Sequence, residues 1–413
     1  MQTNPDRYKW QSTLLFVFML VGLAMYFSLA IFILFASGFE LIAPQSGVSP
    51  DIGANFIVAC GLGLCGLTML PAVYFSFKRI RGKTIQPFQA RPVRIWQALA
   101  LATGWIGAVL LSDYLYQNFS LGWLASAPFY GISVGAPLVL LVWIGLGGIP
   151  LGSRNRFWGS LGIGMTVGPF LASILELLIY AGILLIMLFI IVLNSNWLAS
   201  LQQLISKLQG TPNLDRLMPI LAPYLTNPFI LISIFLMLGV FTPLIEETLK
   251  PAIVWLLAKR LQRPSQGFAL GIISGAGFAL VESMLASSTP GQGWGQLLAA
   301  RAGGGLMHIF ASGLMGWGIA SAWQGKRLRL LGTYGLSVLV HGLWNCAAIL
   351  IEVGALQPYL NNTGISKSLD AFPILGIIIL VVLVLMTLPA LILINRKMRQ
   401  PDPTIPVPPE PMI

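Results

Sequence analysis

Few residues of this chain can do chemistry, and most of them stand inside apolar runs. Glu246 and Glu247 are adjacent carboxylates, and Lys250 follows within one helical turn. The run around them, 227–258, is long enough to cross a bilayer, which takes about 20 apolar residues. A charge at the bilayer centre costs at least about 2.5–3.5 kcal/mol. We therefore expect these three side chains to have water, partners or a catalytic task.

The two histidines of the chain, His308 and His341, also lie inside apolar runs. At 1.5 Å per residue, each lies about 16 Å from one end of its predicted helix, as does Glu247. In a hydrocarbon core about 30 Å thick, the three side chains meet near the midplane. Asn345 follows His341 by four residues, so both lie on one helical face. An acid, an imidazole and an amide donor are what peptide hydrolysis needs: a base for water, and donors for the oxyanion.

Two prolines interrupt the 227–258 run beside the glutamates. Pro243 is expected to leave the Gly239 carbonyl without its helical partner, and Pro251 to do the same for the Glu247 carbonyl. Freed carbonyls beside carboxylates make a site that can hold water.

Structural interpretations stand beside the catalytic one. Either glutamate of the 246–247 pair can form an ion pair with Lys250 inside the helix. Glu282 and Arg301, both in the outer third of their predicted helices, can pair at equal depth. One intramembrane histidine is often only a packing residue, but two at the midplane beside paired carboxylates favour a functional site.

The elements that position these residues are transmembrane helices. Of the 413 residues, 56% are hydrophobic and 9% are charged, which excludes a soluble globular protein. The fold class is therefore an all-α polytopic membrane protein. Gly267, Gly271 and Gly275 form a small-residue stripe for close packing in one of its helices. The apolar runs predict ten spans, at 12–37, 54–77, 95–115, 128–151, 168–193, 228–258, 266–288, 297–322, 330–352 and 371–394.

Basic residues predict the orientation of the chain. With both termini in the cytoplasm, 19 of the 24 Lys and Arg residues lie in cytoplasmic segments and three on the opposite side. Such a bias is the usual orientation signal, and an even number of spans agrees with it. The net charge of +11 is thus explained by topology and anionic lipid headgroups, so nucleic acid is not an expected partner.

The run 158–193 is too long for a single span, because a helix of that length measures about 54 Å. Gly162, Gly164 and Pro169 predict a break that leaves an interfacial piece followed by a span. Glu176 lies about two turns into that span. We interpret it as a hydrated or hydrogen-bonded carboxylate, with a role in a substrate channel as the alternative.

The chain divides into three predicted regions. Residues 1–227 form a membrane region of about five spans, which ends in an outer loop, 195–227, with an amphipathic helix in it. Residues 228–352 form a four-helix core with the charged motifs. Residues 353–413 hold the last span and a proline-rich cytoplasmic tail, which we expect to be disordered.

Four short motifs follow one another on four successive helices of the core. They are Glu-Glu-x-x-Lys at 246–250, Phe-x-x-x-Glu at 278–282, Arg-Ala-Gly-Gly-Gly-Leu-Met-His at 301–308 and His-Gly-Leu-Trp-Asn at 341–345. Together they resemble the PrsW family of intramembrane proteases. That family is related to the CAAX prenyl endopeptidases and, more distantly, to the APH-1 subunit of gamma-secretase. The resemblance covers about 228–352.

The resemblance implies a glutamate-dependent endopeptidase in a prokaryotic cell membrane, acting on membrane-anchored proteins. Glu246 would be the general base that activates water, with Glu247 assisting it. His308 would hold the water. His341 and Asn345 would stabilise the oxyanion.

The resemblance also implies supporting roles for Lys250, Glu282 and Arg301. Glu282 stands where the CAAX prenyl endopeptidases have a histidine, which argues against a prenylated substrate. APH-1 proteins lack the paired glutamates, so these residues favour catalysis over a non-catalytic scaffold. An ion- or proton-coupled transporter remains an alternative use of the same charges, although we see no internal repeat. The oligomeric state stays open.

A metal mechanism is the last alternative. Zinc catalysis usually recruits three protein ligands and a water. Glu246, His308 and His341 meet that count, but no His-x-x-x-His or His-Glu-x-x-His pair lies on one helix. We expect a metal-free glutamate mechanism, with catalysis by Zn²⁺ on these three residues as the alternative.

Overall fold

The computed structural model describes residues 9–42, 51–209, 214–360 and 369–399, which are almost entirely helical. The predicted disorder of the 401–413 tail lies outside the described residues. The helices are α1 (Lys9–Ile42), α2 (Ile52–Ile80), α3 (Ile95–Asn118), α4 (Gly122–Leu146), α5 (Arg154–Met165), α6 (Val167–Leu193), α7 (Ser195–Gln209), α8 (Leu214–Leu225), α9 (Pro228–Leu236), α10 (Thr242–Leu249), α11 (Ala252–Leu257), α12 (Pro264–Ala286), α13 (Trp294–Trp323), α14 (Arg327–Gly354) and α16 (Ala371–Arg399).

Shorter elements join these helices. A π-helical turn, η2 (Met237–Phe241), connects α9 to α10, and 3₁₀ turns η3 (Ala258–Arg260) and η4 (Gln357–Tyr359) follow α11 and α14. Two short strands, β1 (Pro87–Gln89) and β2 (Pro150–Ser153), pair antiparallel with Pro87 opposite Ser153.

Nine helical segments of the described chain are long and apolar enough to cross a membrane. They are α1, α2, α3, α4, α5 with α6, the segment from α9 to η3, α12, α14 with η4, and α16. The remaining predicted span, 297–322, corresponds to α13, which is 30 residues long but rich in glycine and interrupted by Arg301 and His308. The chain is therefore a multi-pass all-α membrane protein.

Several predicted boundaries shift in the structure. Helix α4 begins at Gly122 rather than at 128, because Pro128 lies inside the helix instead of marking its start. The predicted 228–258 span is broken into α9, η2, α10 and α11. The predicted break in 158–193 falls at Thr166, between α5 and α6. Helix α5 packs against α12, where a Cβ added at Gly164 would clash with the Ser274 carbonyl.

Helices α12 and α13 form the centre of the bundle. Nearly all of α12 is buried, and the two backbones touch along the predicted glycine stripe. A Cβ added at Gly271 would clash with the Ser312 carbonyl, and one added at Gly275 would lie 2.6 Å from the His308 carbonyl oxygen. Because only glycine allows this approach, the stripe sets the distance between the helices that carry Glu282 and His308.

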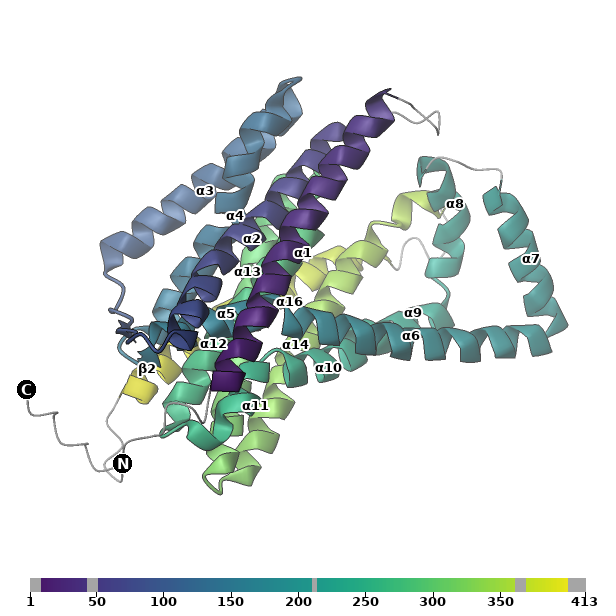
Figure 1. Ribbon diagram of the computed structural model, residues 1–413. Helices are drawn as coiled ribbons and strands as arrows, with labels where there is room; N and C mark the ends of the chain where they lie inside the picture. Colours follow the sequence, from purple (N-terminus) through teal and green to yellow (C-terminus); the bar gives the residue numbers. More distant parts are fainter. Residues whose placement is uncertain (1–8, 43–50, 210–213, 361–368, 400–413) are drawn as a thin grey trace, which may run out of the picture.

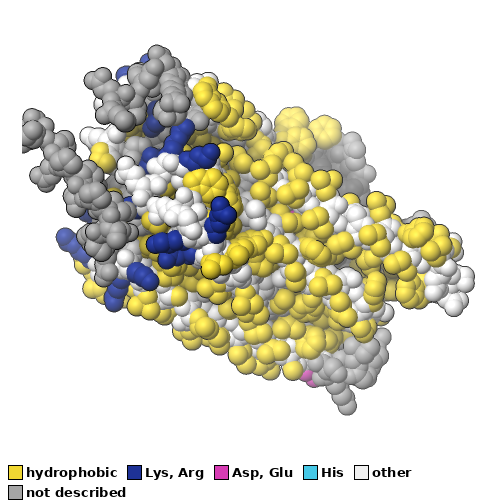
Figure 2. Space-filling model, turned by 90° about the horizontal axis from the view of Figure 1, so that it is seen from below, with side chains coloured by type: hydrophobic (Ala, Val, Ile, Leu, Met, Phe, Trp, Pro, Cys, Tyr) yellow, Lys and Arg dark blue, Asp and Glu magenta, His cyan; other side chains and the backbone are white. Residues whose placement is uncertain are grey.

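The peripheral helices surround this centre unevenly. Helices α1 and α2 pack side by side, whereas α6 runs across the direction of α1 (Figure 1). Helices α7 and α8 follow at the far end of α6, and α7 is the amphipathic helix that was predicted in the outer loop. Figure 2 shows Lys and Arg side chains gathered at one end of the molecule. The cytoplasmic location of that end and the domain boundaries at 227 and 353 stay predictions.

Candidate active site

The site begins where the chain is bent between α9 and α11. The N–H of Thr242 donates to the carbonyl of Met237, five residues back, which is the spacing of a π-helix. Helix α10 then runs for eight residues and ends before Pro251. This short helix carries Glu246 and Glu247, and both are buried, with 8% and 0% of their surface exposed.

Lys250 is the centre of the charged cluster. Its side chain is fully buried, and its Nζ lies 2.8 Å from Oε2 of Glu246 and 2.7 Å from Oε1 of Glu247. The same Nζ lies 2.7 Å from Nδ1 of His308 and 4.7 Å from the ring centroid of Phe278. The predicted ion pair inside the helix is therefore present with both glutamates, and it extends to a second helix.

His308 links this lysine to a second pair of charges. Its Nε2 lies 2.7 Å from Oε2 of Glu282, whose Oε1 accepts a hydrogen bond of 2.9 Å from Nη2 of Arg301. Because Nδ1 faces the ammonium of Lys250, Nδ1 is the acceptor and Nε2 carries the proton in the neutral ring. The predicted Glu282–Arg301 pair is thus part of the site, and the depth of Glu282 in the membrane stays a prediction.

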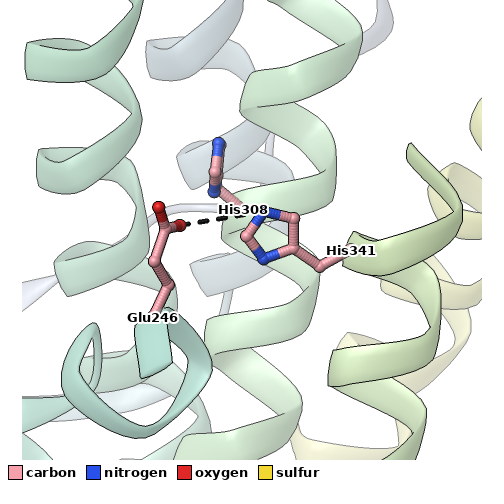
Figure 3. Close-up of side chains that lie close together, drawn as sticks. All are labelled: Glu246, His308 and His341. Carbon is pink, nitrogen blue, oxygen red and sulfur yellow. Dashed lines mark ion pairs between the residues drawn. The ribbon is translucent and has the colours of Figure 1, made fainter. Parts of the chain in front are cut away.

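His341 approaches the two glutamates from α14. Its Nδ1 lies 2.9 Å from Oε1 of Glu247, so this nitrogen donates to the carboxylate. Its Nε2 lies 3.7 Å from Oε2 of Glu246 (Figure 3). That gap is too long for a direct hydrogen bond, and a contact of this length is of the kind that one water bridges. The planes of the His308 and His341 rings make an angle of 74°, and the ring centroids are 5.3 Å apart.

Asn345 lies one turn beyond His341 but makes a different contact. Its Nδ2 donates a hydrogen bond of 2.8 Å to the carbonyl oxygen of Leu238, in the π-helical turn. The structure therefore places this amide against the backbone that precedes α10.

Helix α6 adds two polar residues that the sequence analysis did not assign to the site. The carboxyl of Glu176 lies close enough to the Glu246 carboxyl for the two groups to interact electrostatically. One turn further, the hydroxyl of Tyr180 is hydrogen-bonded to the hydroxyl of Thr242. These residues are spaced by four on both α6 and α10, so the two helices meet along matching faces. The signal in the sequence was the pair of polar residues at that spacing in an otherwise apolar span.

Three side chains of the site could hold a metal ion, but Lys250 competes for their atoms. One ligand atom each from Glu246, His308 and His341 lies within 4.8 Å of the others, as a metal would require. However, the Lys250 ammonium already contacts Glu246 and His308, and the second nitrogen of His308 faces Glu282. Zinc would need these atoms at about 2.0–2.2 Å. As arranged, these atoms surround the ammonium of Lys250, and a metal would have to take its place.

Comparison with known proteins identifies a family for this chain. A family model described as PrsW family intramembrane metalloprotease matches residues 172–388, which is more than half of the chain. The match begins on α6 and ends on α16, so it includes Glu176 and all four motifs. No curated protein and no solved structure matches the chain.

Proposed function

Because the chain belongs to the PrsW family of intramembrane proteases, we propose that it cleaves membrane-anchored proteins with a water molecule activated by Glu246. The observation that carries this proposal is the position of Glu246 at the edge of a buried network of opposite charges. Glu246 is slightly exposed and faces His341, whereas Glu247 is sealed between Lys250 and His341. Of the two glutamates, Glu246 alone keeps part of its side-chain surface exposed, 11% against 0%, although its Oε2 is buried.

The proposed reaction follows from the contacts of Glu246. Water that enters the site hydrogen-bonds to both Oε2 of Glu246 and Nε2 of His341, which are 3.7 Å apart. Glu246 takes a proton from this water while the water oxygen attacks the carbonyl carbon of the peptide. The carboxylic acid then gives that proton to the leaving nitrogen as the C–N bond breaks. The ammonium of Lys250 stabilises the negative charge of the transition state.

The two histidines then have roles that differ from those implied by the resemblance. Both ring nitrogens of His308 are engaged, by Lys250 and by Glu282, so His308 is better suited to orient Lys250 than to hold water. His341 has one nitrogen bonded to Glu247 and the other turned toward Glu246, which suits it to hold the water.

Terminal-peptide proteomics tests the proposed function. Membranes from cells with the wild-type protein and with Glu246→Gln would be compared for new protein N-termini. We expect N-termini near membrane segments that are present only with the wild type. Identical terminal profiles under several growth and stress conditions would contradict the proposal.

The metal-free mechanism predicts that chelators have no effect. We expect the purified protein to cleave a substrate found by proteomics at the same rate before and after treatment with 1,10-phenanthroline. The reason is that Lys250 supplies the positive charge that a metal would otherwise provide. If the chelator abolished cleavage and added Zn²⁺ restored it, the chain would be a metalloprotease, as the description of the family says.

A further inference from the structure

The π-helical turn before Glu246 lacks one hydrogen bond of its own. In this turn the N–H of Thr242 donates to the carbonyl of Met237, five residues back. At the same spacing, the next bond would join the N–H of residue 243 to the carbonyl of Leu238. Residue 243 is proline, which has no N–H. The ladder therefore cannot satisfy the Leu238 carbonyl, and an unpaired carbonyl is costly inside a membrane.

Asn345 supplies the missing donor. Its Nδ2 lies 2.8 Å from the Leu238 carbonyl oxygen, a normal hydrogen-bond length. The amide thus occupies the place that a backbone N–H at residue 243 would otherwise fill.

The backbones of α14 and the π-helical turn are in direct contact beside this bond. A Cβ added at Gly342 would clash with the Gly239 carbonyl, and one added at Gly239 would lie 2.6 Å from Sγ of Cys346. The π-helical turn therefore packs against one turn of α14, at Gly342, Asn345 and Cys346. The residue before it, His341, contacts Glu247.

The π-helical turn decides which way the glutamates point. A π-helical turn contains one residue more than an α-helical turn, and each residue turns the chain by about 100°. If η2 relaxed to α-helical spacing, Glu246 and Glu247 would rotate by about that angle relative to α9. They would then face away from Lys250 and the histidines, or α9 would have to rotate instead.

We infer that Asn345 is a positioning residue: its amide replaces the N–H that Pro243 lacks and holds the π-helical turn that directs Glu246 and Glu247 into the site. This inference rests on the proposed function, because it assigns Asn345 a task within the same active site. It differs from the oxyanion role that the resemblance implies. Asn345 acts through the backbone of η2 and does not touch the substrate.

Restoring the missing N–H tests this inference. Asn345→Ala is expected to lower kcat by about 10–100-fold with KM nearly unchanged, as is usual for a partner behind a catalytic group. Pro243→Ala provides an N–H opposite the Leu238 carbonyl. The double variant Asn345→Ala with Pro243→Ala is therefore expected to regain most of the lost rate. If Asn345 instead donated a hydrogen bond to the oxyanion of the substrate, an N–H at residue 243 could not replace it.

Hydrogen exchange of the 237–242 amides gives a readout that needs no substrate. We expect faster exchange in Asn345→Ala and in Asn345→Leu, which keeps the side-chain volume but has no donor. Protection should return in the double variant. If both cleavage and protection stay as low in the double variant as in Asn345→Ala, the inference is wrong. Should the chain show no proteolysis at all, the exchange result alone still decides the role of Asn345.

Discussion

Glu246→Gln is expected to lower the rate of peptide cleavage by about 10²–10⁴-fold, the range of a general base, while the protein stays folded. Glutamine has the shape of glutamate but cannot take the proton of water. Lys250 keeps its contact with Glu247, 2.7 Å away, so the buried ammonium retains a counter-charge. Cleavage of a substrate found by proteomics, with thermal unfolding in detergent, measures both effects.

Glu247→Gln is the matched control for this prediction. Glu247 is completely buried and bonds both Lys250 and His341, so its loss removes a charge from a sealed ion pair. Leaving a buried charge without any partner costs about 3–5 kcal/mol; here Lys250 keeps Glu246, 2.8 Å away, but the buried bond to His341 is lost as well, which has no counterpart in Glu246→Gln. We therefore expect Glu247→Gln to lower thermal stability clearly, and Glu246→Gln to leave it nearly intact. The reverse pattern would mean that Glu247 is the base.

Much of the site was predictable because depth in a membrane can be counted along a helix. The rise of 1.5 Å per residue places Glu247, His308 and His341 at one level, and the structure brings them together around Lys250. The count did not predict that the Glu282 carboxylate contacts His308, because it ignores helix tilt and side-chain length. The glycine contact at Gly275 holds α12 against the backbone of His308, and the Glu282 side chain spans the remaining distance.

Other parts of the site depend on tertiary structure that the sequence does not specify locally. Helix α6 starts beside α10 and runs crosswise to α1, which brings Glu176 close to Glu246, and no pattern within α6 indicates that direction (Figure 1). The freed carbonyl beside Pro243 was expected at Gly239, on the assumption of α-helical spacing. The π-helical turn leaves the Leu238 carbonyl without a backbone donor, and Asn345 binds it.

Lys250→Met is expected to have the largest effect on folding of any single change. The ammonium contacts Glu246, Glu247 and His308 and is fully buried. Its removal leaves two carboxylates without a counter-charge, so we expect a loss of at least about 3–5 kcal/mol and little protein in the membrane. Lys326→Met, at an exposed position before α14, should accumulate normally.

Removing the carboxylate charges together with the lysine separates folding from catalysis. Replacing a buried ionic cluster with uncharged residues of similar size is often neutral or stabilising. The triple variant Lys250→Met, Glu246→Gln, Glu247→Gln is therefore expected to accumulate in the membrane and yet cleave nothing. Accumulation and thermal unfolding measure the first effect, and the cleavage assay measures the second. If Lys250→Met alone accumulated and cleaved at the wild-type rate, the lysine would be dispensable and the proposed metal-free site would fail. If instead Lys250→Met fails to accumulate and the triple variant accumulates without cleaving, the charges of this cluster lower the stability of the protein and are present because hydrolysis needs them.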